Sequence, residues 1–260
     1  MKNVLVLSGF GINCENETKN AFDIVGASAE IIHINAILQN PDLLDKYDII
    51  VFPGGFSYAD NLGSGFGLAS IIELSIKNKL LELIDKNKII LGICNGCQVL
   101  IKLGFFNHEN DKITIINNKN SIGYRCMWRD CEPQNTWHFQ DIQKIKLPVA
   151  HGEGCFVDLS KNNKTQDELD DLKQNSLINK NCKIILKYQE NQNHNGSDYN
   201  VAGISNRKEN VIAIIPHPER AICFDENKKN ATIMKNSMLN FDDISIYKRF
   251  FHNLVRDVKF

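Results

Sequence analysis

A cysteine between two glycines has the setting in this sequence that best fits covalent chemistry. Cys94 lies in the stretch GICNG at 92–96, directly after the apolar run 88–91 and before a segment with helical spacing. This G-x-C-x-G layout is that of a nucleophile elbow, in which glycines allow a tight strand-to-helix turn that exposes the nucleophile. The free N–H groups and positive dipole at the start of a helix favour a thiolate. Cys94 is therefore the candidate nucleophile, with a small buried core residue as the alternative.

A histidine and a glutamate later in the chain supply the groups that such a nucleophile needs. His217 and Glu219 lie in PHPE at 216–219, directly after the apolar run 211–215. Each proline biases the residue before it toward extended geometry, and in an extended segment these two side chains point to one side. Glu219 would then orient the imidazole, leaving its other nitrogen for the cysteine sulfur. The predicted catalytic triad is Cys94, His217 and Glu219; a surface turn with an incidental ion pair is the alternative.

Two other segments with chemical potential also follow expected strands. In PGGFSYAD at 53–60, paired glycines let backbone N–H groups approach a phosphate or an oxyanion, although an ordinary mobile loop has the same composition. The pattern G-x-x-x-x-G-K-[ST] is missing there, which excludes a P-loop. In HGEG at 151–154, His151 is a candidate ligand or base, and a hydrogen-bonded structural histidine is the alternative.

The elements that position these residues alternate between strand and helix in the first half of the chain. Strands are expected at 4–7, 30–34 and 48–52, with helices at 13–26 (capped by Asn13), 41–46 and 66–83. This order predicts an α/β fold with a doubly wound, mostly parallel sheet and helices on both faces. In such sheets the ligand site lies beyond the carboxyl ends of the strands, where Cys94 and the 53–60 segment fall.

The second half of the chain is less regular. Expected strands lie at 113–116, 144–150, 182–188, 201–205 and 211–215, the last two as a hairpin or as neighbours. The polar stretch 161–180 is interpreted as an exposed insertion, and 244–255 has the spacing of a terminal helix. No internal repeat or linker is evident, so we expect residues 1–260 to form one domain.

Composition narrows the function classes. The chain has 260 residues, 43% of them hydrophobic, and a net charge of -1, so it has enough apolar residues for a sizeable core. The balanced charge gives no case for nucleic acid or an anionic membrane surface, and no apolar run reaches the length of a membrane span. Eight cysteines without an apolar leader are expected to stay reduced, which indicates a cytoplasmic protein.

These motifs together resemble the class I, or triad, glutamine amidotransferases. More narrowly, they are similar to the glutaminase subunits (subunit I) of phosphoribosylformylglycinamidine synthase. The matching segments occur in the family's order and span most of the chain: Asn13-Cys14-Glu15, PGGFSYAD at 53–60, GICNGCQ at 92–98, PVAHGEG at 148–154, Asn195-Gly196-Ser197, Ala202-Gly203-Ile204 and PHPER at 216–220.

The resemblance implies roles for individual residues. Cys94 would attack the amide carbon of L-glutamine, giving a γ-glutamyl thioester and ammonia, while His217 moves the protons and Glu219 orients it. The N–H groups of Gly55 and Asn95 would form the oxyanion hole. The residues implied to hold glutamine are Gly54, Phe56, Gln98, His151, Gly152 and Glu153.

The resemblance also implies a partner. Ammonia would pass to a separate synthetase subunit that uses ATP and magnesium to convert formylglycinamide ribonucleotide to its amidine in de novo purine synthesis. The resemblance leaves open whether a small third subunit also belongs to the complex. No metal or cofactor is expected in this chain itself.

The sequence departs from the family pattern at several positions. Asn61 and Gly63 follow PGGFSYAD where the family usually continues with Tyr, Leu and Arg, and Arg125 and Met127 alter two charged positions. His194 replaces the proline of an N-P-N-G-S turn. We expect these changes to affect a partner interface or loop closure.

Three other function classes compete with this interpretation. A redox or zinc protein would use Cys94 and Cys97 as a C-x-x-C pair, which is a weak zinc signal without a second pair or nearby histidines. A stand-alone cysteine hydrolase or chaperone would share the elbow but would not need PGGF and PHPE together. A non-catalytic binding subunit would not need an intact triad.

Overall fold

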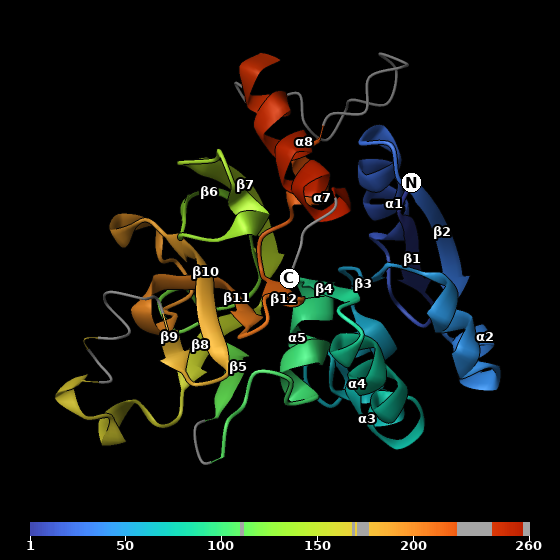
Figure 1. Ribbon diagram of the computed structural model, residues 1–260. Helices are drawn as coiled ribbons and strands as arrows, with labels where there is room; N and C mark the ends of the chain where they lie inside the picture. The colour runs from blue at the N-terminus through green and yellow to red at the C-terminus, as the bar shows by residue number, and fades with distance from the viewer. Residues whose placement is uncertain (110–111, 168–169, 171–176, 223–240, 257–260) are drawn as a thin grey trace.

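The computed structural model describes residues 1–109, 112–167, 170, 177–222 and 241–256 (Figure 1). The helices are α1 (Glu15–Ile24), α2 (Ile34–Gln39), α3 (Phe66–Ser75), α4 (Lys77–Asp85), α5 (Asn95–Lys102), α7 (Pro218–Ala221) and α8 (Phe241–Val255). The strands are β1 (Asn3–Ser8), β2 (Ser28–His33), β3 (Ile49–Phe52), β4 (Ile89–Ile93), β5 (Ile113–Asn117), β6 (Arg125–Pro133), β7 (Ile145–His151), β8 (Glu153–Asp158), β9 (Leu177–Asn179), β10 (Cys182–Tyr188), β11 (Val201–Asn206) and β12 (Val211–Ile214).

The main sheet is parallel on one side and antiparallel on the other. Strands β2, β1, β3, β4 and β12 pair in parallel in that order, which is the 2-1-3-4-5 order of a flavodoxin-like sheet. This confirms the predicted α/β fold class and places the end of β4 beside the end of β12. Beyond β12 the sheet continues antiparallel through β11, β10, β6 and β7, while β5 and β8 form a separate pair.

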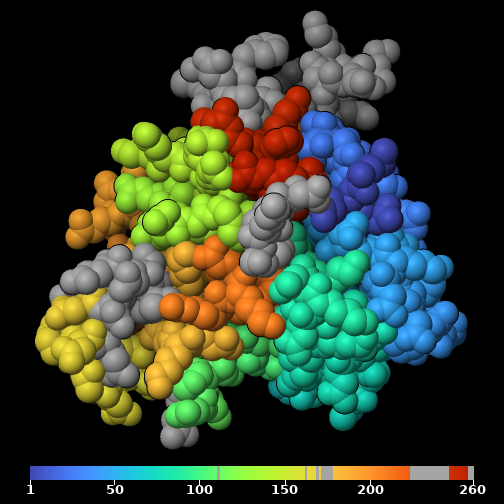
Figure 2. Space-filling model, viewed as in Figure 1, coloured from blue at the N-terminus to red at the C-terminus, as the bar shows by residue number. Residues whose placement is uncertain are grey.

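Helices cover both faces of the parallel half because its strands are apolar on both sides. Along β1, Val4 and Val6 join one buried cluster, and Leu5 and Leu7 join the other. The first cluster includes α1 and α8, where the rings of Phe22 and Phe251 meet edge to face with centroids 5.1 Å apart. The second cluster includes α2 to α5. Figure 2 shows α8 (red) lying between the N-terminal segments (blue) and the β6–β7 region (green).

Two local expectations for helices were wrong. Asn13 does not cap α1: the cap position is Cys14, and the Asn13 side chain accepts a hydrogen bond from the Cys14 thiol at 3.3 Å. The expected single helix at 66–83 is split at Ile76, whose φ of -128° leaves the helical region. The break places the Ile76 side chain in the core, where it is 3% exposed.

Strands β6 and β8 were missed in the sequence. Because β6 is rich in charged and polar residues, it carries no apolar run that would indicate a strand. Strand β8 follows β7 with only Gly152 between them, so HGEG is the junction of two strands and not a loop after one. This junction turns the chain beside the end of β4.

Two further expected segments are described only in part. Within 161–180, residues 161–163 form a 3-10 turn and Leu177–Asn179 form β9, whereas 168–169 and 171–176 lie outside the described residues. The expected terminal helix is present as α8 and begins at Phe241. None of the helices in the described part of the chain has the length and apolar character needed to cross a membrane.

Candidate active site

Cys94 lies on a strained turn between β4 and α5. Its φ of 51° and ψ of -104° are rare for a residue with a side chain, and such strain is typical of nucleophile elbows. The turn is close-packed: a Cβ on Gly96 would lie 1.8 Å from the carbonyl oxygen of Phe52. The Cys94 N–H donates to the Ile214 carbonyl at 2.8 Å, which joins the elbow to the end of β12. The predicted elbow geometry is therefore present.

The neighbouring Cys97 has a different environment. It is fully buried on α5 within the apolar cluster formed with α2 to α4. Burial, together with the charge of Cys94, raises the pKa of the Cys97 thiol well above its ordinary value. Cys94 in contrast lines a cavity. The two cysteines are thus unequal, and a C-x-x-C redox or zinc pair does not fit this arrangement.

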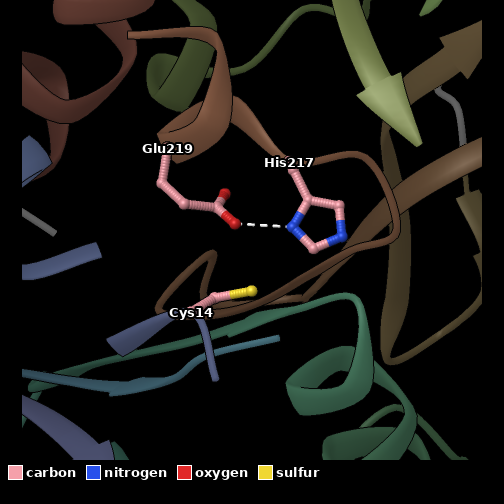
Figure 3. Close-up of side chains that lie close together, drawn as sticks. All are labelled: Cys14, His217 and Glu219. Carbon is pink, nitrogen blue, oxygen red and sulfur yellow. Dashed lines mark hydrogen bonds and ion pairs between the residues drawn. The ribbon is translucent and has the colours of Figure 1, made fainter. Parts of the chain in front are cut away.

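His217 and Glu219 form a buried pair beside the elbow. Figure 3 shows the hydrogen bond between the His217 ring and the Glu219 carboxylate. Nδ1 of His217 lies 2.5 Å from Oε1 of Glu219, and the two residues are 1% and 0% exposed. The predicted extended geometry was wrong, because Pro218 begins α7 and a turn brings the carboxylate back to the ring. Burial disfavours a charged imidazole, but the charges of Glu219 and Cys94 prevail and raise the pKa of His217 well above its usual value.

Two backbone N–H groups next to Cys94 or in the loop that lines its cavity lack a protein acceptor within the described residues. Within the described residues, the backbone amides of Gly55 and Asn95 donate a hydrogen bond to no protein acceptor. The segment around Gly55 is nevertheless fixed: Phe56 N–H donates to the Gly11 carbonyl at 2.8 Å, and Gly54 accepts from Cys14 N–H at 3.2 Å. Gly55 has a φ of 148°, and a Cβ there would lie 2.6 Å from the Gly11 carbonyl oxygen. Such fixed donors suit an oxyanion.

A cavity of about 210 Å³ lies beside Cys94. Of the residues expected to hold glutamine, it is lined by Phe56, Gln98, His151, Gly152 and Glu153. Gly54 does not line it and lies instead against His217. Sequence analysis missed four polar lining residues, Asp60, Ser64, Asn117 and Tyr124. Asp60 closes the PGGFSYAD motif, so the motif itself was a signal for that residue.

A hydrogen-bond network joins the helix α5 to the HGEG junction. The Asn95 amide donates to Gln98 Oε1 at 2.9 Å and to Asp60 Oδ1 at 3.1 Å. The Gln98 amide then donates to the backbone carbonyl of Glu153 at 2.6 Å. Burial raises the pKa of Asp60, helped by the charge of Glu153 and opposed by the donated hydrogen bonds. Gln98 therefore links Asn95 on α5 to the backbone of Glu153, because its amide oxygen accepts from one and its amide nitrogen donates to the other.

His151 forms a buried pair with His194. Their Nε2 atoms are 3.2 Å apart, and the residues are 2% and 8% exposed. Burial lowers the pKa of His151 to about 3 and that of His194 to about 4, with further lowering from neighbouring cationic or imidazole groups. Both rings are therefore neutral near pH 7. The family departure at His194 thus reaches a cavity residue, and Arg125, another departure, lies opposite His151 in the β6–β7 ladder.

One group of metal-ligand types clusters in the described part of the chain. A sulfur, a ring nitrogen and a carboxylate oxygen of Cys14, His217 and Glu219 lie within 4.8 Å of one another. However, Arg220 Nη2 is 2.8 Å from the Cys14 sulfur. A guanidinium in that place opposes a cation, so this cluster does not fit a metal centre.

The fold and the elbow define the class of protein. A family model described as "CobB/CobQ-like glutamine amidotransferase domain" matches residues 1–256. In fold alone, the chain is similar to a solved glutamine amidotransferase from Thermotoga maritima, with a TM-score of 0.56, 16% identity and coverage of 97% of this chain and 96% of that one. The chain is thus a glutamine amidotransferase.

Closer relatives narrow the family. A phosphoribosylformylglycinamidine synthase subunit PurQ from Methanococcus maripaludis (strain C5) is 36% identical over 235 residues, covering 84% of this chain and 83% of the relative. PurQ from Dehalococcoides mccartyi is 36% identical over 233 residues, covering 84% and 85%. A chain in the structure of PurLQS from Thermotoga maritima has a TM-score of 0.71 and 26% identity, covering 98% of each chain. The chain belongs to the PurQ family, which confirms the family predicted from its motifs.

Proposed function

We propose that Cys94, His217 and Glu219 form the triad through which this PurQ-family chain hydrolyses L-glutamine. The observation that carries the proposal is the position of a strained cysteine at the end of β4, next to a buried His–Glu pair at the end of β12. Within the described residues, His217 Nε2 makes no hydrogen bond that meets standard geometry. That nitrogen is available for proton transfer at the Cys94 sulfur.

The chemistry follows from these positions. The Cys94 thiolate attacks the side-chain amide carbon of glutamine, and the N–H groups of Gly55 and Asn95 stabilise the oxyanion that forms. Protonated His217 gives its proton to the leaving nitrogen, which departs as ammonia and leaves a γ-glutamyl thioester. Neutral His217 then takes a proton from water, which attacks the thioester and releases glutamate. Glu219 keeps the ring oriented and stabilises its charged form throughout.

The cavity walls suit the α-ammonium group of glutamine. Asp60 and Glu153 supply carboxylates for the α-ammonium group, and the cavity is lined by no lysine or arginine among the described residues. Phe56 and Tyr124 form a half-exposed pair at the rim, with ring centroids 6.0 Å apart. Gln98, His151 and Gly152 complete the wall that was expected to hold the substrate.

Family membership makes this chain the glutaminase subunit of phosphoribosylformylglycinamidine synthase. Its ammonia goes to the synthetase subunit, which converts formylglycinamide ribonucleotide to its amidine with ATP and magnesium. The chain needs no cofactor of its own for the thioester chemistry. The cytoplasmic location expected from the cysteines and the single domain over 1–260 expected from the lack of a linker remain predictions, and a small third subunit remains an open component of the complex.

The test is Cys94→Ala in a complex reconstituted with the synthetase subunit. Glutamine-dependent amidine formation should be abolished, because no thioester can form, while ammonium chloride should still support synthesis. Cys97→Ala is the matched control and should retain glutamine-dependent turnover. A complex that works with Cys94→Ala and fails with Cys97→Ala would assign the nucleophile to the other cysteine.

A further inference from the structure

A second cysteine contacts the triad but takes no part in the mechanism above. The sulfur of Cys14 lies beside the His217 ring and the Glu219 carboxylate, with the three ligand atoms within 4.8 Å of one another (Figure 3). Cys14 is 0% exposed and does not line the glutamine cavity. It therefore has no path to substrate as a second nucleophile.

The sulfur is held by a residue of the catalytic segment itself. Arg220 follows Glu219 on α7, and its Nη2 donates to the Cys14 sulfur at 2.8 Å. The Cys14 thiol has a second partner in Asn13 Oδ1 at 3.3 Å. The contact between Arg220 and Cys14 joins the start of α1 to α7, the short helix that carries Glu219. Because the contact places the positive charge of Arg220 beside the sulfur, it also disfavours a metal ion there.

The backbone of Cys14 is fixed from both directions. Its N–H donates to the Gly54 carbonyl at 3.2 Å, and its own carbonyl accepts from Thr18 Oγ1 at 2.7 Å and from Thr18 N–H at 3.0 Å. The first bond connects Cys14 to the loop that carries the oxyanion donor Gly55. The position of the sulfur is thus set by α1 and by this loop together.

Gly54 and the Cys14 sulfur together close one side of the His217 imidazole. A Cβ on Gly54 would lie 2.7 Å from His217 Cε1 and 3.0 Å from the Cys14 sulfur, so ring, sulfur and backbone leave no space between them. Glu219 holds Nδ1 of the same ring at 2.5 Å. The Cε1–Nδ1 side of His217 is therefore packed, and Nε2 is the ring nitrogen left for Cys94.

We propose that Cys14 is a positioning residue for the reaction: held by Arg220, its sulfur fixes His217 against Gly54 so that Nε2 faces Cys94. The proposal rests on the triad proposed above. It gives a function to the Asn13-Cys14-Glu15 motif and to the arginine of PHPER, two features that the triad mechanism leaves unused.

The proposal has an electrostatic consequence at His217. The charged and titratable groups around this ring are Glu219 and Arg220 on α7, Cys94 on the elbow, Cys14 before α1, Tyr124 before β6 and His151 on β7. Burial lowers the pKa of His217, whereas Glu219, Cys94 and, with smaller effect, the contact with Cys14 raise it. Removing the sulfur should therefore lower the pKa of His217.

The experiment compares Cys14→Ala and Cys14→Ser with wild type in the reconstituted complex, with steady-state glutamine hydrolysis measured from pH 6 to 10. In Cys14→Ala the His217 ring should move by a fraction of an ångström, which should reduce kcat by about 10- to 100-fold with little change in KM. The alkaline limb of the kcat profile should move to lower pH in Cys14→Ala. Serine keeps a polar acceptor for Arg220, so Cys14→Ser should recover most of the turnover and the wild-type profile.

The matched control is Cys182→Ala, which deletes a fully buried thiol on β10 in the antiparallel half. It should lower the melting temperature and leave the pH profile unchanged. The proposal is overturned if Cys14→Ala behaves as this control does, or if its turnover equals that of wild type. Labelling of wild type by a glutamine-analogue alkylator keeps the two hypotheses apart. Absence of labelling at Cys94 would refute the triad. Normal labelling at Cys94, together with a Cys14→Ala variant whose kcat and pH profile equal those of wild type, would refute only the positioning function.

Discussion

Two histidines near Cys94 are almost equally buried but have opposite acid–base behaviour. His217, at the end of β12, is 1% exposed and has a raised pKa, whereas His151, at the end of β7, is 2% exposed and has a pKa lowered to about 3. Burial pushes both rings toward the neutral form. A carboxylate at 2.5 Å reverses this for His217, while the neighbour of His151 is another imidazole at 3.2 Å. The neighbouring charge therefore decides which histidine can carry a proton at neutral pH.

The largest effect should come from removing each histidine in turn. His217→Ala should reduce kcat for glutamine hydrolysis by about 10²- to 10⁴-fold, because proton transfer at sulfur and at the leaving nitrogen is lost. His151→Gln keeps a neutral hydrogen-bonding side chain and should act mainly on KM. Steady-state kinetics of the two variants in the reconstituted complex measures this, and equal losses of kcat would remove the functional distinction between the two histidines.

Glu219→Gln should have a smaller effect than His217→Ala, because the amide can still orient the ring. The substitution removes the charge that raises the pKa of His217 most, so that pKa should fall. Turnover needs the protonated ring for ammonia release, and the alkaline limb of the kcat profile should therefore move to lower pH. An unchanged profile from pH 6 to 10 would show that Glu219 does not set the charge of His217.

The surroundings of the two histidines also differ in the space beside a neighbouring glycine. A Cβ on Gly54 would press on His217 Cε1 at 2.7 Å, whereas a Cβ on Gly152 has its nearest neighbour at 4.0 Å. Gly54→Ala should therefore displace the imidazole and reduce kcat by about 10- to 100-fold. Gly152→Ala is its comparison: kcat should stay close to wild type, and any effect of a methyl group in the cavity wall should fall on KM. Similar kinetics for both variants would mean that the ring tolerates movement.

The smallest effect concerns stability in acid. The pKa values of His151 and His194 in the folded protein, about 3 and about 4, lie below the ordinary value of 6.5. As the pH falls below 6.5, the unfolded chain therefore binds protons that the folded chain excludes, and the free energy of unfolding falls by about 1.4 kcal/mol per pH unit for each proton. This loss continues until the pH approaches the folded values.

His194→Gln should therefore make the free energy of unfolding less dependent on pH between 6.5 and 4.5. Urea titrations at several pH values measure this slope. His252→Gln, at an exposed position on α8, is the control and should leave the slope unchanged. The same slope in wild type and His194→Gln would contradict the burial of a neutral histidine pair.

The sequence was most informative where the physics is local. Continuous apolar runs predicted the strands of the parallel half, because strands buried on both faces need no alternation. Strand β6 has no such run: its pairing with β7 and β10 is set by backbone hydrogen bonds to distant segments. The helix break at Ile76 was also not predicted, since nothing in the local sequence pattern opposes a continuous helix there.

In the candidate site, too, the local motifs predicted some features and only the tertiary contacts decided others. Glycine spacing around Cys94 and the short motif PHPE were sufficient to select Cys94, His217 and Glu219 as candidates, although the extended geometry expected for PHPE was wrong. Only the tertiary structure decided what surrounds them: Arg220 reaches Cys14 across 206 residues, and His194 reaches His151 across 43. Distances of this kind set the pKa values and the packing of the ring. They depend on how strands from both halves of the chain meet at one edge of the sheet, which no local pattern records.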